Sequence, residues 1–332
     1  MSQFTKSFIA KFGSQISLHK FTFLAGSILL AGLVACAHSP ANTSVILGTA
    51  TPGGGFTLYG GELAKIVNES NSGLLIEPRN TRGSLENIPL LESGELDIAL
   101  VSGEPAYEAL SGVNGPAADL RIILAMYSTP GMFAVRGDSP YQTISDLEGQ
   151  PIAFGTRSSG LPILAHYVLD GMGLNREEDF EAIFVDRASD GPVMLREGSV
   201  EAIWGGGSGW PSFVTVIEEG GRFIFPTDED IEKILNKHSY LRDLTLAVNS
   251  YPGQSEAMRS VGSWSFLLAR PTLDEEVAYR LTRALHQNEM AFAELLPQAA
   301  ESTAANTATA AYRSELLHPG THRYLQEIGL ID

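Results

Sequence analysis

The stretch VILGTATPGGGFTLYGGELAKIV (residues 45–67) decides the fold of this chain. It opens with a short apolar run at residues 45–47, which is typical of a buried strand. From residue 56 to residue 67 the apolar side chains recur at the spacing of one helix face. A turn rich in glycine and threonine separates the two parts. The pattern predicts a strand, a tight turn and a helix.

The composition of this turn indicates an anion-binding cradle. The glycines at residues 53–55 let the backbone approach a ligand because they have no side chains. The N-terminus of the following helix would direct free N–H groups and the positive end of its dipole at that ligand. Thr51 and Thr57 can add hydroxyl donors. A tight turn without any ligand is the structural alternative.

Two familiar nucleotide motifs do not fit this turn. The dinucleotide fingerprint G-x-G-x-x-G fails because Leu58 stands where its third glycine is required. A phosphate loop needs lysine after its second glycine, and Gly61 stands at that position. Neither nucleotide interpretation holds.

A second copy of the same pattern occurs at residues 151–169, PIAFGTRSSGLPILAHYVL. An apolar run at residues 152–154 precedes a turn of glycine, threonine and serine, and apolar side chains then recur at helical spacing. Two such units predict two α/β lobes that each direct a helix N-terminus into a shared cleft.

The chain has 332 residues, enough for two ordinary domains, and a formal net charge of −17. Its three charges before Cys36 are all lysines, so removal of that segment makes the remainder still more acidic. An acidic chain of this kind does not follow nucleic acid or an anionic membrane surface by general electrostatics. Any anionic ligand must be held by local dipoles and a few arginines.

The first 35 residues are predicted to be an export signal. Three lysines form its basic region, and residues 21–35 form an apolar core that is too short to span a bilayer. The sequence Leu33-Val34-Ala35-Cys36 resembles a bacterial lipoprotein box, which predicts lipidation of Cys36, a tether over residues 36–44 and a periplasmic, lipid-anchored protein. An ordinary signal peptide with an incidental cysteine is the alternative.

An ordered set of further motifs resembles the TAXI family, the extracytoplasmic solute-binding subunits of TRAP transporters. The likeness extends from about residue 45 to residue 329. Its motifs, besides the first turn, are TRGSLEN (81–87), GELDIAL (94–100), ISDLEG (144–149), GTRSSG (155–160), YPGQ (251–254) and HPG (318–320).

The resemblance implies a two-lobed, clamshell periplasmic-binding-protein fold of the type II α/β class with a hinge between the lobes. We expect residues 45–133 and 250–332 to form the first lobe and residues 134–249 to form the second. Hinge closure would trap a small carboxylate such as glutamate, glutamine or 2-oxoglutarate and present the closed protein to TRAP membrane subunits.

Turn positions, strand ends and one aromatic wall supply the predicted ligand contacts. These are Thr51, Gly54, Gly55, Phe56, Thr57, Thr81, Ser84, Asn87, Ser102, Tyr127, Arg157, Ser158, Ser159, Gly160 and Trp204. No metal and no cofactor is predicted, since His318 and His322 have no evident third ligand. We also expect no catalytic residue.

The sequence is also compatible with two other functions. A receptor of the same fold could inform a sensor kinase, and the neighbouring genes would distinguish it from a transport protein. An extracytoplasmic hydrolase would use Ser158 or Ser159, but only His166 stands nearby and no paired acid is evident.

Overall fold

The computed structural model describes residues 42–113, 115–311 and 313–332. The predicted export signal, Cys36 and most of the predicted tether lie outside these residues. Within the described ranges, no helix has the length and apolar character that crossing a membrane requires.

The predicted strand–turn–helix units are confirmed, with the first strand starting two residues earlier than expected. The strands are β1 (Thr43–Gly48), β2 (Leu74–Arg79), β3 (Ile98–Val101), β4 (Arg121–Val135), β5 (Pro151–Ala153), β6 (Glu181–Ile183), β7 (Ala202–Gly206), β8 (Arg222–Ile224), β9 (Arg242–Leu246) and β10 (Met258–Ala269).

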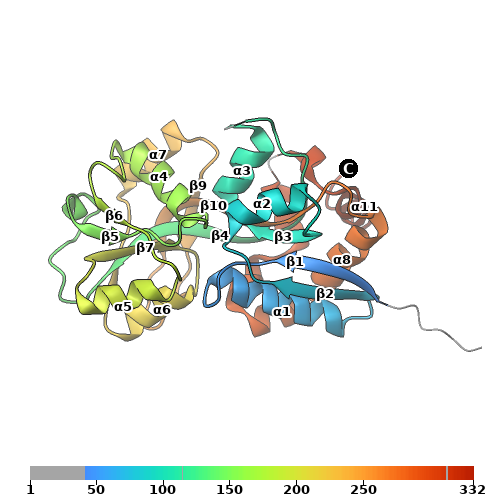
Figure 1. Ribbon diagram of the computed structural model, residues 1–332, viewed down its shortest axis with the longest axis horizontal. Coiled ribbons are helices and arrows are strands. Elements are labelled where there is room, and N and C mark those ends of the chain that lie inside the picture. Colours follow the sequence, from blue (N-terminus) through green and yellow to red (C-terminus); the bar gives the residue numbers. More distant parts are fainter. Residues whose placement is uncertain (1–41, 114, 312) are drawn as a thin grey trace, which may run out of the picture. The chain divides into compact units, whose positions relative to one another are not determined.

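Helices alternate with these strands in both halves (Figure 1). They are α1 (Gly55–Glu69), α2 (Ser84–Glu92), α3 (Gly103–Ser111), α4 (Leu161–Met172), α5 (Asp190–Glu197), α6 (Pro211–Glu218), α7 (Asp228–Lys237), α8 (Glu275–Gln287), α9 (Glu289–Leu295), α10 (Ala304–Ala310) and α11 (Pro319–Glu327). Short 3₁₀ turns are η1 (Ser145–Leu147), η2 (Pro297–Glu301) and η3 (Ser314–Leu316).

One path of paired strands runs through both lobes in the order β2-β1-β3-β10-β4-β7-β5-β6, with β8 on β4 and β9 on β10. In the first lobe β1 is parallel to β2 and β3, and in the second lobe β5 is parallel to β6 and β7. The carboxyl ends of parallel strands are where open α/β sheets place their ligands. Both Gly-rich turns follow such an end.

Two long strands carry the chain between the lobes. Residues 121–130 of β4 pair with β10, and residues 131–135 pair with β7 and in part with β8. The sequence of residues 121–136 predicts two strands around a break at residues 127–131, but β4 is continuous. An extended backbone accommodates Pro130, and the Pro130 carbonyl still accepts a hydrogen bond from the Gly207 amide at 3.1 Å.

The return crossing lies at Gly262, where β10 exchanges β9 for β4 as its partner. This point comes after the expected boundary at residues 249 and 250. Tyr251 and Met258 still pack in the hydrophobic core of the second lobe, which explains why the chain changes lobes so late. A side chain at Gly262 would put its Cβ 1.9 Å from the Thr129 carbonyl oxygen, so the two crossing strands need glycine there.

Each lobe has an apolar core on both faces of its sheet. Along β3, Ile98 and Leu100 face one core while Ala99 and Val101 face the other. This alternation follows from the two-residue period of a strand, and burial on both faces explains the unbroken apolar run in the sequence. The two cores per lobe fix the strand ends that carry the site.

Candidate functional site

The first turn is held in shape by its own hydrogen bonds. The Gly54 amide donates to the Thr51 carbonyl at 3.1 Å, and the Thr57 hydroxyl donates to the same carbonyl at 2.8 Å. The hydroxyl of Thr57 therefore points into the turn. Gly54, Gly55 and Phe56 remain on the side of the turn that lines a cavity.

Two other predicted contacts stabilise the turn from the side that faces away from the cavity. Asn87 is fully buried, and its amide donates to the carbonyl oxygens of Thr49 and Leu100, both at 2.8 Å. The Thr81 hydroxyl donates to the same Thr49 carbonyl at 3.1 Å and accepts from the Gly83 amide. Both side chains position the strand ends, and neither lines the cavity.

Two serines from neighbouring helix starts meet in the cavity wall. The Ser84 hydroxyl accepts from the Ser102 amide at 3.0 Å and lies 3.2 Å from the Ser102 hydroxyl. Gly83 is the N-cap of α2, and Ser84 is the first residue of the helix.

The second turn contributes one lining serine and two contacts between the lobes. The Ser159 hydroxyl donates to the Thr156 carbonyl at 2.9 Å, and Ser159 lines the cavity. The Ser158 carbonyl accepts from the Leu85 amide of the first lobe at 3.1 Å. Gly160 lies against Ser102, where an added Cβ would come within 2.3 Å of the serine Cβ. The two turns therefore meet across the lobes.

Together these elements enclose one interlobe cavity with a free volume of about 90 Å³. A single water needs roughly 10–15 Å³ on this measure, so the cavity suits a small molecule. Its lining comprises Ala50, Thr51, Gly54, Gly55, Phe56, Arg82, Gly83, Ser84, Ser102, Tyr127, Thr129, Gly155, Thr156, Ser159, Leu161, Ala188, Gly206, Trp210 and Ser265.

Five helices begin at this cavity. They contribute N-cap or first-turn residues to its lining: Gly54 and Gly55 of α1, Gly83 and Ser84 of α2, Ser102 of α3, Leu161 of α4, and Trp210 of α6. In none of the five does the side chain of the N-cap residue cap the helix, although the Leu85 amide of α2 donates to the Ser158 carbonyl and the Trp210 amide of α6 donates to the Tyr251 hydroxyl. Each helix start carries about half a positive charge, so their convergence gives the cavity a positive potential.

The lining adds hydroxyls and a single formal charge, which is Arg82. Tyr127 is 6% exposed, and burial raises the pKa of its phenol, so the group is protonated at neutral pH. The cavity thus holds hydrogen-bond donors and a cation without any carboxylate in its lining. This arrangement favours a bound anion.

The aromatic wall is Trp210 and not Trp204. Trp204 on β7 is fully buried in the core of the second lobe, and its indole N–H donates to the Leu161 carbonyl at 2.9 Å. Trp210 lies at the start of α6, with its ring Cδ1 3.4 Å from a Cβ built on Gly55. The Trp210 ring packs directly against Gly205, where a Cβ would lie 2.3 Å from the ring atom Cζ3.

Among the predicted contacts, Thr51, Gly54, Gly55, Phe56, Ser84, Ser102, Tyr127 and Ser159 line the cavity. The others, Thr57, Thr81, Asn87, Arg157, Ser158, Gly160 and Trp204, do not. Thr156 and Trp210 do line it, although neither is among the predicted contacts. Two sequence features indicated them: Gly155-Thr156 repeats the Gly-Thr pair of the first unit, and Trp210 stands directly before Pro211.

Neither serine of the second turn is arranged as a nucleophile. In the described part of the chain no hydrogen bond joins Ser158 or Ser159 to a histidine, and the Ser159 hydroxyl donates to a backbone carbonyl. A serine hydrolase needs a base within hydrogen-bond reach of its nucleophile. The site contains no support for that alternative.

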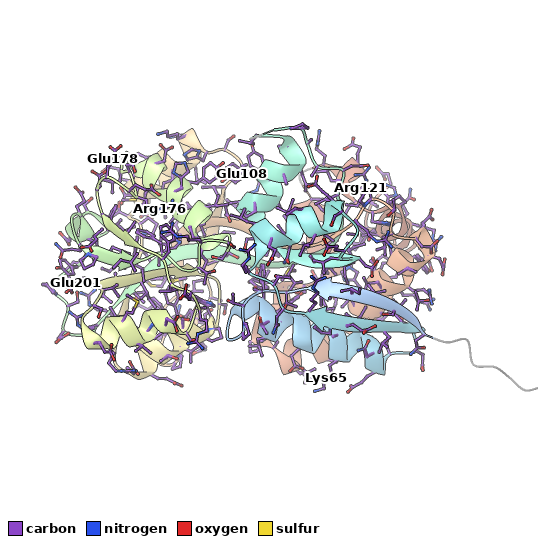
Figure 2. All side chains as sticks on the ribbon, viewed as in Figure 1. Lys65, Glu108, Arg121, Arg176, Glu178 and Glu201 are labelled. Atoms are coloured by element: carbon purple, nitrogen blue, oxygen red, sulfur yellow. The ribbon has the colours of Figure 1, made fainter. Side chains whose placement is uncertain are left out.

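Outside the cavity, aromatic side chains of the two lobes form a second contact. Tyr107 of α3 stacks on Tyr240 with ring centroids 3.9 Å apart, and the Tyr167 hydroxyl of α4 donates to Glu108 Oε1 of α3 at 2.8 Å. Figure 2 labels Glu108 on α3, beside the second lobe. Burial and the neighbouring carboxylate raise the pKa of Tyr167, so its phenol stays a donor at neutral pH. These residues join the two lobes outside the cavity.

Tyr167→Phe is expected to weaken ligand binding about fivefold. The change removes the hydrogen bond from Tyr167 to Glu108, which forms only when the two lobes are in contact. At this half-buried position the bond contributes about 1 kcal/mol to the free energy of lobe closure. Titration calorimetry with a carboxylate that the unaltered protein binds measures this loss of affinity. Tyr279→Phe is the matched control, because Tyr279 donates to Glu327 within the first lobe. Equal effects of both changes would show that the contact does not stabilise closure.

The two-lobed α/β fold, with a cavity between the lobes, is the fold of the periplasmic solute-binding proteins. The predicted fold class is confirmed. Residues 47–329 match the NMT1-like family, and the chain belongs to that family. The narrower TAXI assignment stays a prediction.

Several solved structures are similar to this chain. A protein from Bordetella bronchiseptica RB50 is 14% identical with a TM-score of 0.53, over 86% of this chain and 97% of its own. The periplasmic aliphatic sulphonate binding protein SsuA from Escherichia coli is 19% identical with a TM-score of 0.49, over 87% and 79%. The alkanesulfonate-binding protein SsuA from Xanthomonas axonopodis pv. citri bound to MOPS is 17% identical with a TM-score of 0.48, over 86% and 84%.

Proposed function

We propose that this protein is an extracytoplasmic solute-binding protein that captures a small carboxylate-type ligand between its lobes. The observation that carries the proposal is the convergence of five helix N-termini on one cavity with no carboxylate in its lining. Helix dipoles and backbone amides bind anions without a counter-ion. Membership of the NMT1-like family and the two-lobed fold support the same function.

The mechanism follows from the contacts between the lobes. A ligand bound to the first-lobe helix starts would recruit the second turn, whose Ser158 carbonyl and Gly160 dock on α2 and α3. Closure would exclude water and strengthen each electrostatic contact with the ligand. The ligand would then be presented to a membrane transporter.

The partner in this proposal is a TRAP-type transporter, and the protein is held at a membrane in the periplasm through a lipid on Cys36. Both parts rest on the TAXI resemblance and the lipoprotein box of the sequence. A sensor kinase as partner remains the alternative, and a TRAP permease gene beside this gene would favour transport.

A ligand screen by thermal unfolding tests the binding function. A carboxylate present at about 100 times its Kd should stabilise the protein by about 2.7 kcal/mol and raise Tm by roughly 4–5 °C. The neutral amide of the same acid is the control and should leave Tm unchanged, because helix N-termini favour anions. If amides or amines stabilise the protein and carboxylates do not, the proposed ligand class is wrong.

A further inference from the structure

Aromatic side chains form one part of the interlobe cavity. Phe56, Tyr127 and Trp210 each line it with a ring, and Leu161 adds an aliphatic side chain. The rings of Phe56 and Tyr127 meet edge to face, with centroids 6.5 Å apart. A Cβ built on Gly55 would lie 3.4 Å from Trp210 Cδ1 and 3.9 Å from the Tyr127 hydroxyl oxygen, so these two side chains border the same glycine. An apolar group of a ligand therefore meets three rings in this cavity.

The polar part of the lining holds no negative charge that could balance a cation. Among the described residues that line the cavity, none carries a carboxylate, a carboxamide or an imidazole, and Arg82 carries the only formal charge. An ammonium group is costly to bury without a carboxylate partner. The positive ends of the helix dipoles at this cavity would also repel it. The lining therefore disfavours the α-ammonium group of an amino acid.

The cavity directly beside the first gives an ammonium group no better place. It has a free volume of about 190 Å³ and shares three lining residues with the interlobe cavity. Its lining contains one carboxylate, Asp186, together with the guanidinium groups of Arg82 and Arg157. Glu86 forms an ion pair with Arg82 at 3.3 Å but lines neither cavity. Two cations against one carboxylate leave this second lining with an excess of positive charge.

We propose that the ligand is a monocarboxylate with an apolar body and without an amino group. Its carboxylate lies at the helix N-termini, and its body packs against Phe56, Tyr127 and Trp210. This ligand differs from glutamate and glutamine, which the TAXI resemblance implies, because the cavity has no partner for their ammonium group. The inference rests on the proposed function, since it needs a carboxylate at the helix starts.

Titration calorimetry with pairs of acids that differ only in the α-ammonium group tests this ligand class. The apolar pairs are 3-phenylpropanoate with phenylalanine and 4-methylpentanoate with leucine, and the polar pair is glutarate with glutamate. Propanoate is included because both apolar acids are propanoate with one apolar substituent on its third carbon. Each acid is measured on the unaltered chain, on Phe56→Ala and on Leu58→Ala. Leu58 is the control because it lies on the same helix, is 43% exposed and lines neither cavity.

At least one of the two apolar acids should bind the unaltered chain tenfold or more tightly than its amino acid, and tenfold or more tightly than propanoate. Phe56→Ala should lower the affinity for that apolar acid about tenfold and leave the affinity for propanoate unchanged, because propanoate has no group that reaches the ring. Leu58→Ala should leave both affinities unchanged. The measurements on the unaltered chain decide the ligand class even if Phe56→Ala does not fold.

Three results would overturn this ligand class. In the first, the amino acids bind the unaltered chain as tightly as their analogues without the ammonium group. In the second, glutarate binds more tightly than both apolar acids. In the third, a folded Phe56→Ala protein keeps full affinity for the apolar acids. Each of these leaves the carboxylate-binding function standing, whereas failure of all seven acids to bind would remove that function as well.

Discussion

Gly160→Ala is expected to weaken ligand binding by on the order of 10- to 100-fold, the equivalent of forcing one extra methyl group into a packed contact. The added Cβ would lie 2.3 Å from the Ser102 Cβ and 2.5 Å from its hydroxyl oxygen, across the boundary between the lobes. The clash exists only in the closed arrangement. Gly160 has a φ of −77°, which any residue adopts, so the backbone itself is not strained.

The unfolding free energy of the ligand-free Gly160→Ala protein should fall by no more than about 1 kcal/mol, because alanine is a weaker N-cap than glycine. Calorimetric titration measures the affinity and urea unfolding the stability. Ser102→Gly removes the atoms that the new methyl group meets, so Gly160→Ala should cost much less in that background. Gly61→Ala, on an open face of α1, should leave affinity unchanged. A Gly160→Ala protein with full affinity would exclude closure through this contact.

Glu104→Gln is expected to make the protein more stable at pH 8 by up to about 3 kcal/mol. Glu104 is 1% exposed at the start of α3, and burial raises its pKa to about 7 against the opposing effect of a hydrogen bond from the Ser263 hydroxyl at 2.6 Å. The ordinary value is 4.5. A shift of this size corresponds to about 3 kcal/mol at 1.36 kcal/mol per pH unit.

The sign of this pH dependence follows from proton binding. Because the folded state binds the Glu104 proton more tightly than the unfolded state, this group favours folding below about pH 4.5, and its contribution is lost as the pH rises to about 7. Glutamine keeps the shape and cannot ionise. Urea unfolding of both proteins at pH 5 and pH 8 isolates the effect, since other titrating groups are common to both. If the unfolding free energies of the two proteins differ by the same amount at pH 5 and at pH 8, ionisation of Glu104 does not cause the pH dependence.

Local pattern was sufficient to predict the two strand–turn–helix units. The apolar run of β1, the glycines at residues 53–55 and the helical spacing after Phe56 all lie within 25 consecutive residues, and the same holds for β5 and α4. Such short-range signals depend on the 2.0- and 3.6-residue periods of strand and helix. The eight predicted contacts that line the cavity all lie in a turn, at a helix start or on the strand that crosses between the lobes.

Long-range packing decided which side chains face the ligand space. Thr57, Thr81 and Asn87 have the polar groups of ligand contacts, but each one donates to a backbone carbonyl and fixes a turn. Their direction depends on the register of neighbouring strands and on where the next helix begins. Residue type and spacing contain neither quantity.

The sequence by itself determined that this chain has two α/β lobes, each with a Gly-rich turn at a helix N-terminus, because those features need only neighbours along the chain. Only the tertiary structure decided that Trp210 and not Trp204 faces the cavity, that Gly160 contacts Ser102, and that Arg82 and Arg157 line one cavity. Each of these depends on how β4 and β10 bring the two lobes together, and that meeting joins residues far apart in the sequence.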